Sequence, residues 1–279
     1  MYFGSHVSIR RGFLEAAKHA RSIGGRSFQY FPKNPRSLTL KTLDRRDAEA
    51  CAAFCREHDM RSIAHTPYPT NLAVEAGERR DIVVRSLLND LEIAEACGSV
   101  GIIVHFGIYK GSDPLDGYKN IVATLNEVLD RWSGDTPLLI ENQSGEHARM
   151  GMTLEELVGI RNLCVRPEAV GFCLDTCHSF ASGLWDGSNW TDVLARGDAL
   201  GYFAQLKAVH LNDSVYPCRS FKDRHANVGK GFIGETAFRS FLASPWIERL
   251  PVVLETPAAG SDTHEQEIRQ LHRLAEGKR

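Results

Sequence analysis

The chain has 279 residues, of which 43% are hydrophobic and 24% charged, and its formal net charge is −2 with a sequence pI of about 6.6. This composition is typical of a soluble globular protein. It excludes a strongly basic protein that coats nucleic acid, so nucleic-acid contact would need a local basic surface. We expect no membrane segment, because no apolar run reaches spanning length. We also expect a cytoplasmic chain with reduced cysteines, because no secretion signal opens the sequence.

Short apolar runs alternate with amphipathic helical patterns along the whole chain. The predicted strand–helix units are 2–5 and 12–23, 27–31 and 44–58, 61–64 and 79–97, 100–104 and 118–132, 138–140 and 154–163, 170–174 and 190–200, 206–209 and 235–242, and 252–254 and 265–275. Continuously apolar runs are typical of parallel strands covered on both faces. Eight units therefore predict one α/β domain over 1–279, a (β/α)₈ TIM barrel. A doubly wound open sheet is the alternative, but residues 4–12 (GSHVSIRRG) lack a GxGxxG turn.

Six side chains able to bind metal occupy the same place in successive units, at the end of a predicted strand. In a barrel these carboxyl ends meet at one mouth, where active sites are built. Helix capping or a rim hydrogen bond would explain one such residue, but not six in succession. The six residues are His65, His105, Glu141, Asp175, His210 and Glu255.

Three further candidate ligands follow those strand ends on predicted loops. They are His178, three residues after Asp175, and the pair Asp223 and His225. A D-x-H pair puts both donors on one side of an extended backbone, where they can chelate one ion. Imidazoles and carboxylates, with no thiolate in a plausible position, suit Zn²⁺, Mn²⁺ or Fe²⁺. Nine ligands exceed the needs of one metal and fit a cluster of two or three, the kind of site that cleaves phosphate esters.

Three segments together, GFCLDTCHSFASG (171–183), HLNDS (210–214) and DRHANVGKGFIG (223–234), resemble the endonuclease IV family of apurinic/apyrimidinic-site DNA repair enzymes. The resemblance covers nearly the whole chain, from GSHVS at 4–8 to LETP at 254–257. It implies three zinc ions at the mouth of the barrel. By this resemblance His65 and His105 hold the first ion, Glu141 bridges it to a second held by Asp175, His210 and Glu255, and His178, Asp223 and His225 hold the third.

The resemblance also implies the reaction. The enzymes of this family are metal-dependent phosphodiesterases that cut double-stranded DNA 5′ to an abasic site, leaving a 3′-hydroxyl and a 5′-deoxyribose phosphate. We expect Glu141 to be catalytic by orienting a bridging hydroxide that acts as nucleophile. Because an abasic site lacks its base, less free energy is needed to flip it out of the duplex than for an intact nucleotide. We further expect trimming of blocked 3′ ends, a monomer with no obligate protein partner, and nucleoid association when acting on DNA.

Candidate DNA contacts lie on loops around the predicted mouth. The only acidic residue of the loop 215–231 is the predicted ligand Asp223, so its basic residues form a local positive patch. Such a patch favours phosphate contact, with an ordinary solvated loop as the alternative. Two residues on other loops are expected to enter the duplex near the lesion, with rim packing as the alternative. The phosphate-contact candidates are Arg219, Lys222, Arg224 and Lys230, and the two duplex-entering candidates are Arg36 and Tyr68.

The chain departs from the family pattern at three loops. Ala226 stands where the family often has His or Glu after the ligand His225, and Ser37 and Leu38 follow Arg36 where larger polar and aromatic residues are usual. Pro69 replaces a larger apolar residue. These departures lie in loops that the resemblance implies take part in lesion recognition and DNA bending, and they leave the ligand set whole.

Three other functions remain to be weighed. A xylose isomerase-like sugar isomerase or epimerase would use only Glu141, Asp175, His210 and Glu255, and would leave five ligands unexplained. A lesion-binding protein without catalysis would be expected to have a broken ligand set. A metal-dependent phosphoesterase for small molecules is opposed only by the basic loop and by Arg36 and Tyr68.

Overall fold

The computed structural model describes residues 1–258 and 263–276. Eight parallel strands close into a barrel in the order β1-β10-β7-β6-β5-β4-β3-β2. The barrel strands are β1 (Tyr2–His6), β2 (Ser27–Tyr30), β3 (Arg61–His65), β4 (Ile102–Val104), β5 (Leu138–Glu141), β6 (Val170–Asp175), β7 (Leu206–His210) and β10 (Pro251–Leu254). The predicted TIM barrel is thus confirmed.

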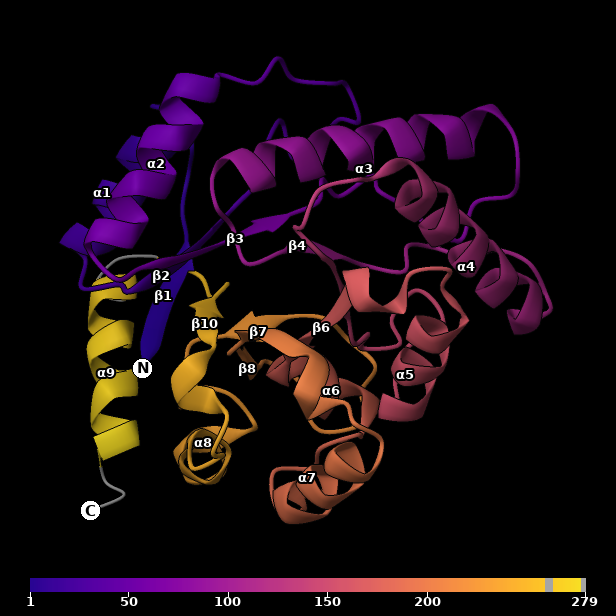
Figure 1. The fold of residues 1–279 in the computed structure, drawn as a ribbon. Helices are drawn as coiled ribbons and strands as arrows, with labels where there is room; N and C mark the ends of the chain where they lie inside the picture. The colour runs from indigo at the N-terminus through magenta and orange to yellow at the C-terminus, as the bar shows by residue number, and fades with distance from the viewer. Residues whose placement is uncertain (259–262, 277–279) are drawn as a thin grey trace.

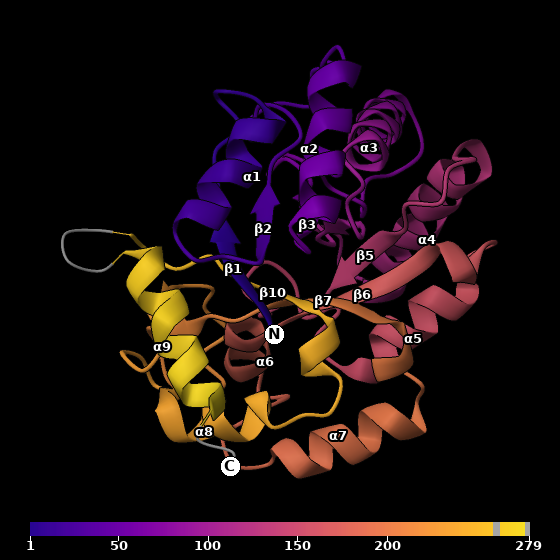
Figure 2. The same ribbon diagram turned by 60° about the vertical axis from the view of Figure 1, so that its left-hand side comes forward.

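Helices surround the strands (Figure 1). They are α1 (Phe13–Ser22), α2 (Arg45–Glu57), α3 (Glu78–Ala96), α4 (Pro114–Arg131), α5 (Leu154–Leu163), α6 (Thr176–Ser182), α7 (Trp190–Ala199), α8 (Gly234–Leu242) and α9 (His264–Glu276), with short 3-10 turns at Pro167–Ala169, Phe203–Gln205 and Ile247–Arg249. The C-terminal helix α9 packs beside β1, where the Phe3 and His272 rings lie 5.0 Å apart (Figure 2). None of the described helices is long and apolar enough to span a membrane.

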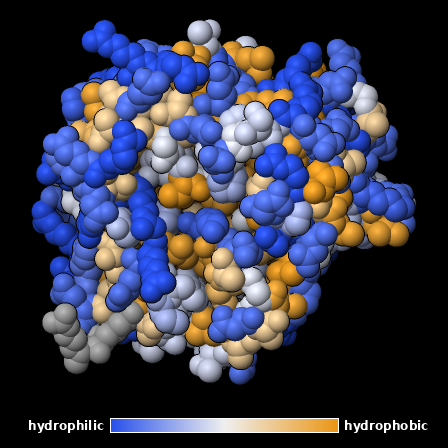
Figure 3. Space-filling view, viewed as in Figure 1, coloured by the Kyte–Doolittle hydropathy of each residue, from blue (hydrophilic) through white to orange (hydrophobic). Residues whose placement is uncertain are grey.

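The barrel interior explains the apolar residues within the strands. One fully buried side chain from each of six strands forms a single layer inside the barrel: Ile63, Ile103, Leu139, Cys173, Ala208 and Val253. On β1, a Cβ at Gly4 would lie 1.7 Å from the Ser27 carbonyl oxygen, so only glycine fits there. The outward-facing side chains of the strands pack against the helices. The face of the molecule seen in Figure 3 carries more hydrophilic than hydrophobic residues.

Two elements at the mouth differ from the sequence prediction. The segment after Asp175 was expected to be a loop but forms α6, which begins where an Asp175 carboxylate oxygen accepts the His178 N–H at 2.7 Å and ends at Gly183 (φ 86°). Residues 176–181 are buried on all sides, so they show no amphipathic period. The loop after β7 contains an antiparallel pair, β8 (Asp213–Ser214) and β9 (His225–Ala226).

A buried ion pair fixes the loop after β2. The Lys33 ammonium lies 2.9 Å from a carboxylate oxygen of Asp90 on α3, and donates to the Ser86 carbonyl at 2.8 Å. Burial raises the pKa of Asp90 to about 7, although Lys33 acts in the opposite direction. The pair ties the loop that carries Arg36 to the outer layer of helices.

Candidate metal centre

The six residues predicted at strand ends lie together at the carboxyl end of the barrel. Four of them are the last residues of β3, β5, β6 and β7, and the other two directly follow β4 and β10. Since all eight strands are parallel and closed, these ends form one ring. The side chains are His65, His105, Glu141, Asp175, His210 and Glu255.

The structure brings all nine predicted ligands into three groups, in each of which the donor atoms lie within 4.8 Å of one another. Two groups share Glu141, and the third lies on α6 and the loop after β7. The groups are His65, His105 and Glu141; Glu141, Asp175, His210 and Glu255; and His178, Asp223 and His225.

Glu141 is the centre of this arrangement. Its carboxylate is fully buried, with Oε2 2.9 Å from His105 Nε2 and Oε1 3.0 Å from His210 Nδ1. Oε1 also lies 3.3 Å from a ring nitrogen of His178. Glu141 therefore belongs to two of the three groups, as a ligand that bridges two ions must, and its carboxylate also contacts the ring of His178 from the third group.

Hydrogen bonds to oxygen atoms fix the orientation of four histidines. A carbonyl oxygen can only accept, so the ring nitrogen facing it carries the proton and the other nitrogen is left as a ligand. In three of the four the acceptor is a backbone carbonyl, and in the fourth it is the amide oxygen of Gln29. The bonds join His65 Nδ1 to Thr66 O (2.8 Å), His178 Nδ1 to Asn142 O (2.8 Å), His210 Nε2 to Gln29 Oε1 (2.6 Å) and His225 Nδ1 to Glu255 O (3.4 Å).

Asp175 is held by two asparagines. Asn212 donates to its Oδ2 at 2.7 Å, and the amide oxygen of Asn142 accepts the Asp175 backbone N–H at 2.7 Å. Asn212 also accepts the backbone N–H of Glu255 at 2.8 Å. These buried amides bind neighbouring strand ends together and so limit the freedom of the carboxylates.

The third group lies partly on irregular chain. The carboxylate of Asp223 places Oδ2 3.1 Å from His178 Nε2 and Oδ1 3.1 Å from His225 Nε2. Just before it, Arg219 (φ 61°) and Phe221 (φ 57°) adopt the left-handed conformation, which costs a residue with a side chain roughly 1–2 kcal/mol. His178 was expected on a loop and lies on α6, and His225 lies on β9.

Histidines and carboxylates perturb one another strongly. Burial would lower the pKa of His178, but Asp175 and Asp223 raise it well above its usual value. For His225, burial is likewise outweighed by Asp223 and other carboxylates, and the pKa rises to about 9. Burial would raise the pKa of Glu141, yet neighbouring imidazoles hold it well below its usual range. Without metal, histidines such as His178 and His225 thus tend to be protonated, and a divalent cation that binds them would displace these protons.

The donor set fits divalent metal. Glu141 Oε2, His178 Nε2 and His225 Nε2 are buried, and their near polar neighbours are other members of the ligand set, with which they form no well-aligned hydrogen bond. Such atoms are costly unless something else binds them. Cys177 also lies within 4.8 Å of Asp175 and His225. Burial raises the pKa of its thiol to about 12, which favours the protonated thiol over the thiolate that binds metal.

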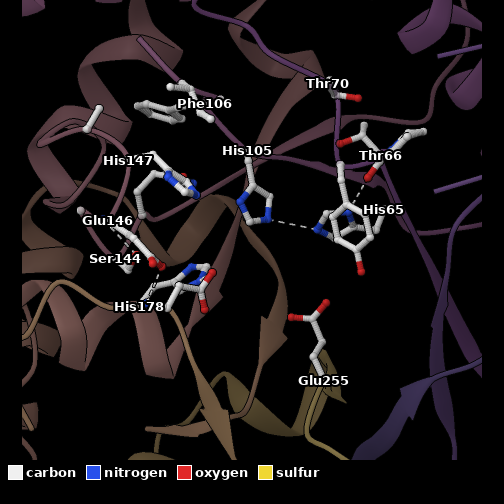
Figure 4. Close-up of a pocket in the computed structure, with 18 of the residues that line it drawn as sticks. His65, Thr66, Thr70, His105, Phe106, Ser144, Glu146, His147, His178 and Glu255 are labelled. Atoms are coloured by element: carbon white, nitrogen blue, oxygen red, sulfur yellow. Dashed lines mark hydrogen bonds and ion pairs between the residues drawn. The ribbon is translucent and has the colours of Figure 1, made fainter. Parts of the chain in front are cut away.

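A cavity of about 590 Å³ opens over these residues. Figure 4 shows His105 between His65 and His178, with Glu255 facing them and Glu146 beside His178. Phe106 and His147 also line the cavity, on the side of His105 away from His65. No pattern in the sequence pointed to His147, Gln29 or Glu146.

The predicted DNA contacts lie at the rim. Tyr68 lines the cavity with 71% of its surface exposed and packs on Phe31, with ring centroids 5.1 Å apart. Its backbone N–H donates to the Pro35 carbonyl at 2.9 Å, which joins its loop to the one carrying Arg36. The four basic residues of the loop after β7 are all exposed, and Nη1 of Arg224 lies 3.3 Å from a carboxylate oxygen of Glu146. They are Arg219, Lys222, Arg224 and Lys230.

Comparisons with known proteins agree with this geometry. Residues 17–276 match the family model described as a xylose isomerase-like TIM barrel. The chain is 42% identical to a probable endonuclease 4 of Symbiobacterium thermophilum, over 96% of this chain and 97% of the relative. The crystal structure of endonuclease IV from Thermus thermophilus superposes with a TM-score of 0.85 at 30% identity, covering 99% of this chain and 100% of that one.

A structure of 3-keto-D-glucoside 4-epimerase from E. coli superposes with a TM-score of 0.68 at 17% identity, over 99% of each chain, and shows a shared fold alone. The likeness to the endonucleases is closer in both sequence and structure. The chain therefore belongs to the endonuclease IV family, whose members are nucleases that hydrolyse phosphodiester bonds.

Proposed function

We propose that this protein is a zinc-dependent DNA repair endonuclease that hydrolyses the phosphodiester 5′ to abasic sites in double-stranded DNA and also trims blocked 3′ ends. The products are a 3′-hydroxyl and a 5′-deoxyribose phosphate. The observation that supports it most is the set of three ligand groups arranged around one buried carboxylate, Glu141, beneath an open cavity.

His65, His105 and Glu141 would hold one ion, Glu141 with Asp175, His210 and Glu255 a second, and His178, Asp223 and His225 a third. Bound zinc would supply a water of lowered pKa and would neutralise charge on the phosphate oxygens.

The protein's own residues position the reaction. Glu141 Oε2, which faces His105 Nε2 at 2.9 Å without a well-aligned hydrogen bond, orients the attacking water. Gln29 and the two asparagines keep the histidines and carboxylates from rotating. No side-chain nucleophile is required, because water attacks the phosphate directly.

The rim residues recognise the lesion. Tyr68, exposed beside the cavity, stacks where the base is missing, and Arg36 on the joined loop enters the same region. The exposed cations of the loop after β7 bind backbone phosphates and position the duplex without reading its sequence.

The test is incision of a duplex that carries one reduced abasic analogue, with products resolved on a denaturing gel. The reduced sugar blocks lyase chemistry, so a nick reports hydrolysis. We expect a single cut directly 5′ to the lesion, none in the undamaged duplex, and removal of a 3′-phosphate from a nicked duplex. An intact lesion strand after incubation with protein shown to hold its zinc would refute the proposal and favour a sugar isomerase or a small-molecule phosphoesterase.

A further inference from the structure

Two loops of the mouth meet above the third ligand group. One is the β5–α5 loop, residues 142–153, and the other is the β7–α8 loop, residues 211–233, which includes β8 and β9. The β7–α8 loop carries Asp223, the only member of the third group that lies outside a helix or strand. The position of Asp223 therefore depends on what holds this loop in place.

Glu146, on the β5–α5 loop, holds Asp223 directly. Its Oε2 accepts the Asp223 backbone N–H at 2.9 Å and lies 3.3 Å from Nη1 of Arg224. The Glu146 side chain is three-quarters buried, and Figure 4 shows it beside His178. The Glu146 carboxylate thus holds the backbone of Asp223, and the Asp223 carboxylate in turn faces His178 and His225.

A second contact joins the same two loops. The guanidinium of Arg149 lies over the Phe221 ring, 3.2 Å from its centroid. The backbone at Gly145 leaves room for this contact, because a Cβ there would come within 2.9 Å of Phe221. Phe221 itself is held in the left-handed conformation, with its N–H bonded to the Ala181 carbonyl at 3.0 Å. The β5–α5 loop thus contacts both neighbours of Lys222 in the sequence, Phe221 through Arg149 and Asp223 through Glu146.

We propose that Glu146 is a positioning residue for the third metal group: by accepting the Asp223 N–H it sets the distance of the Asp223 carboxylate from His178 and His225. This inference rests on the proposed metal centre. Glu146 is not among the predicted ligands and acts through Asp223. Loss of a residue that hydrogen-bonds a metal ligand, as Glu146 bonds Asp223, typically changes metal affinity by about 10–100-fold in other proteins.

The test measures zinc per chain in competition with a chelator of known affinity. We expect Glu146→Ala to lower the affinity for the most loosely held zinc ion at least about tenfold. At a chelator concentration that leaves three zinc ions on each wild-type chain, the variant should then keep two. Glu146→Gln keeps an acceptor oxygen for the Asp223 N–H, so we expect it to stay within about threefold of wild type. Three ions retained with unchanged affinity by Glu146→Ala would overturn the inference, as would equal losses in both variants.

The control is Glu248→Ala, an exposed glutamate in the turn before β10, at the opposite end of the barrel. Melting temperatures of the metal-free proteins show whether a variant has lost its fold. If Glu146→Ala does not fold, Glu146→Leu, which keeps the bulk and lacks the acceptor, takes its place under the same criteria. Because the readout is metal content, a wild type that binds three ions and cuts no DNA would refute the proposed function while leaving this inference standing.

Discussion

Replacing Lys33 by methionine isolates the buried ion pair that holds the loop after β2. Methionine fills the space of the lysine stem but leaves the Asp90 carboxylate without its cation. Apart from Lys33, neither Asp90 oxygen has a polar partner among the described residues, and the carboxylate is fully buried. The carboxyl group must therefore stay protonated in the folded variant, because an unpaired buried charge is strongly disfavoured.

The cost follows from the pKa of Asp90. Burial already raises that pKa from 3.8 to about 7 with Lys33 present, and removing the cation raises it further. A carboxyl group with a raised folded-state pKa binds its proton more tightly in the folded chain, so stability falls as the pH rises above 3.8. The loss is about 1.4 kcal/mol per pH unit and reaches about 4 kcal/mol at pH 7.

Urea unfolding between pH 4.5 and pH 7 measures this loss against the double variant Lys33→Met/Asp90→Asn, whose amide cannot ionise. We expect the single variant to lose stability relative to the double variant at close to 1.4 kcal/mol per pH unit. Both variants keep the same metal centre, so its own titration cancels. Parallel profiles for the two variants would show that Asp90 does not titrate in this range, and the reasoning would fail.

Three further predictions concern the metal centre and its rim. Glu141→Gln should lower incision of the abasic duplex at least about a hundredfold while circular dichroism stays unchanged, because it weakens two ligand groups at once; a wild-type rate would contradict the bridging role. His225→Ala should cost one zinc ion per chain and leave the other two, whereas three retained ions would count against a three-ion centre. Arg36→Ala and Tyr68→Ala should each weaken binding of the abasic duplex in a mobility-shift assay by about 5–100-fold without loss of zinc, and unchanged binding would leave them as packing residues.

The ligand set could be predicted from sequence because the barrel topology alone places the ends of its strands together. Parallel strands in a closed barrel bring residues such as His65 and Glu141 to the same mouth although 76 positions separate them. In the sequence, each of these strand ends is recognisable as an apolar run followed by a polar residue. The nine residues were found in this way together with the family resemblance. Their part as ligands stays a prediction until metal is measured.

The contacts between loops could not be predicted. Glu146 meets Asp223 only because two irregular segments fold toward each other, and no periodic pattern records that approach. Gln29 was missed for a different reason: it lies inside β2 in an apolar run, where one amide gives no sign of its bond to His210. Helix α6 was missed because it is buried on all sides, although Asp175 and Gly183 mark its two ends.

The strand order has a consequence for how the protein is made. The last ligand, Glu255, follows β10, and β10 lies between β1 and β7, so the final strand of the sequence closes the barrel against the first. Synthesis runs from the N-terminus, so a growing chain lacks both closure and Glu255 until nearly all of it has been translated. A chain that ends before residue 251 therefore lacks both the strand that closes the barrel and the predicted ligand Glu255.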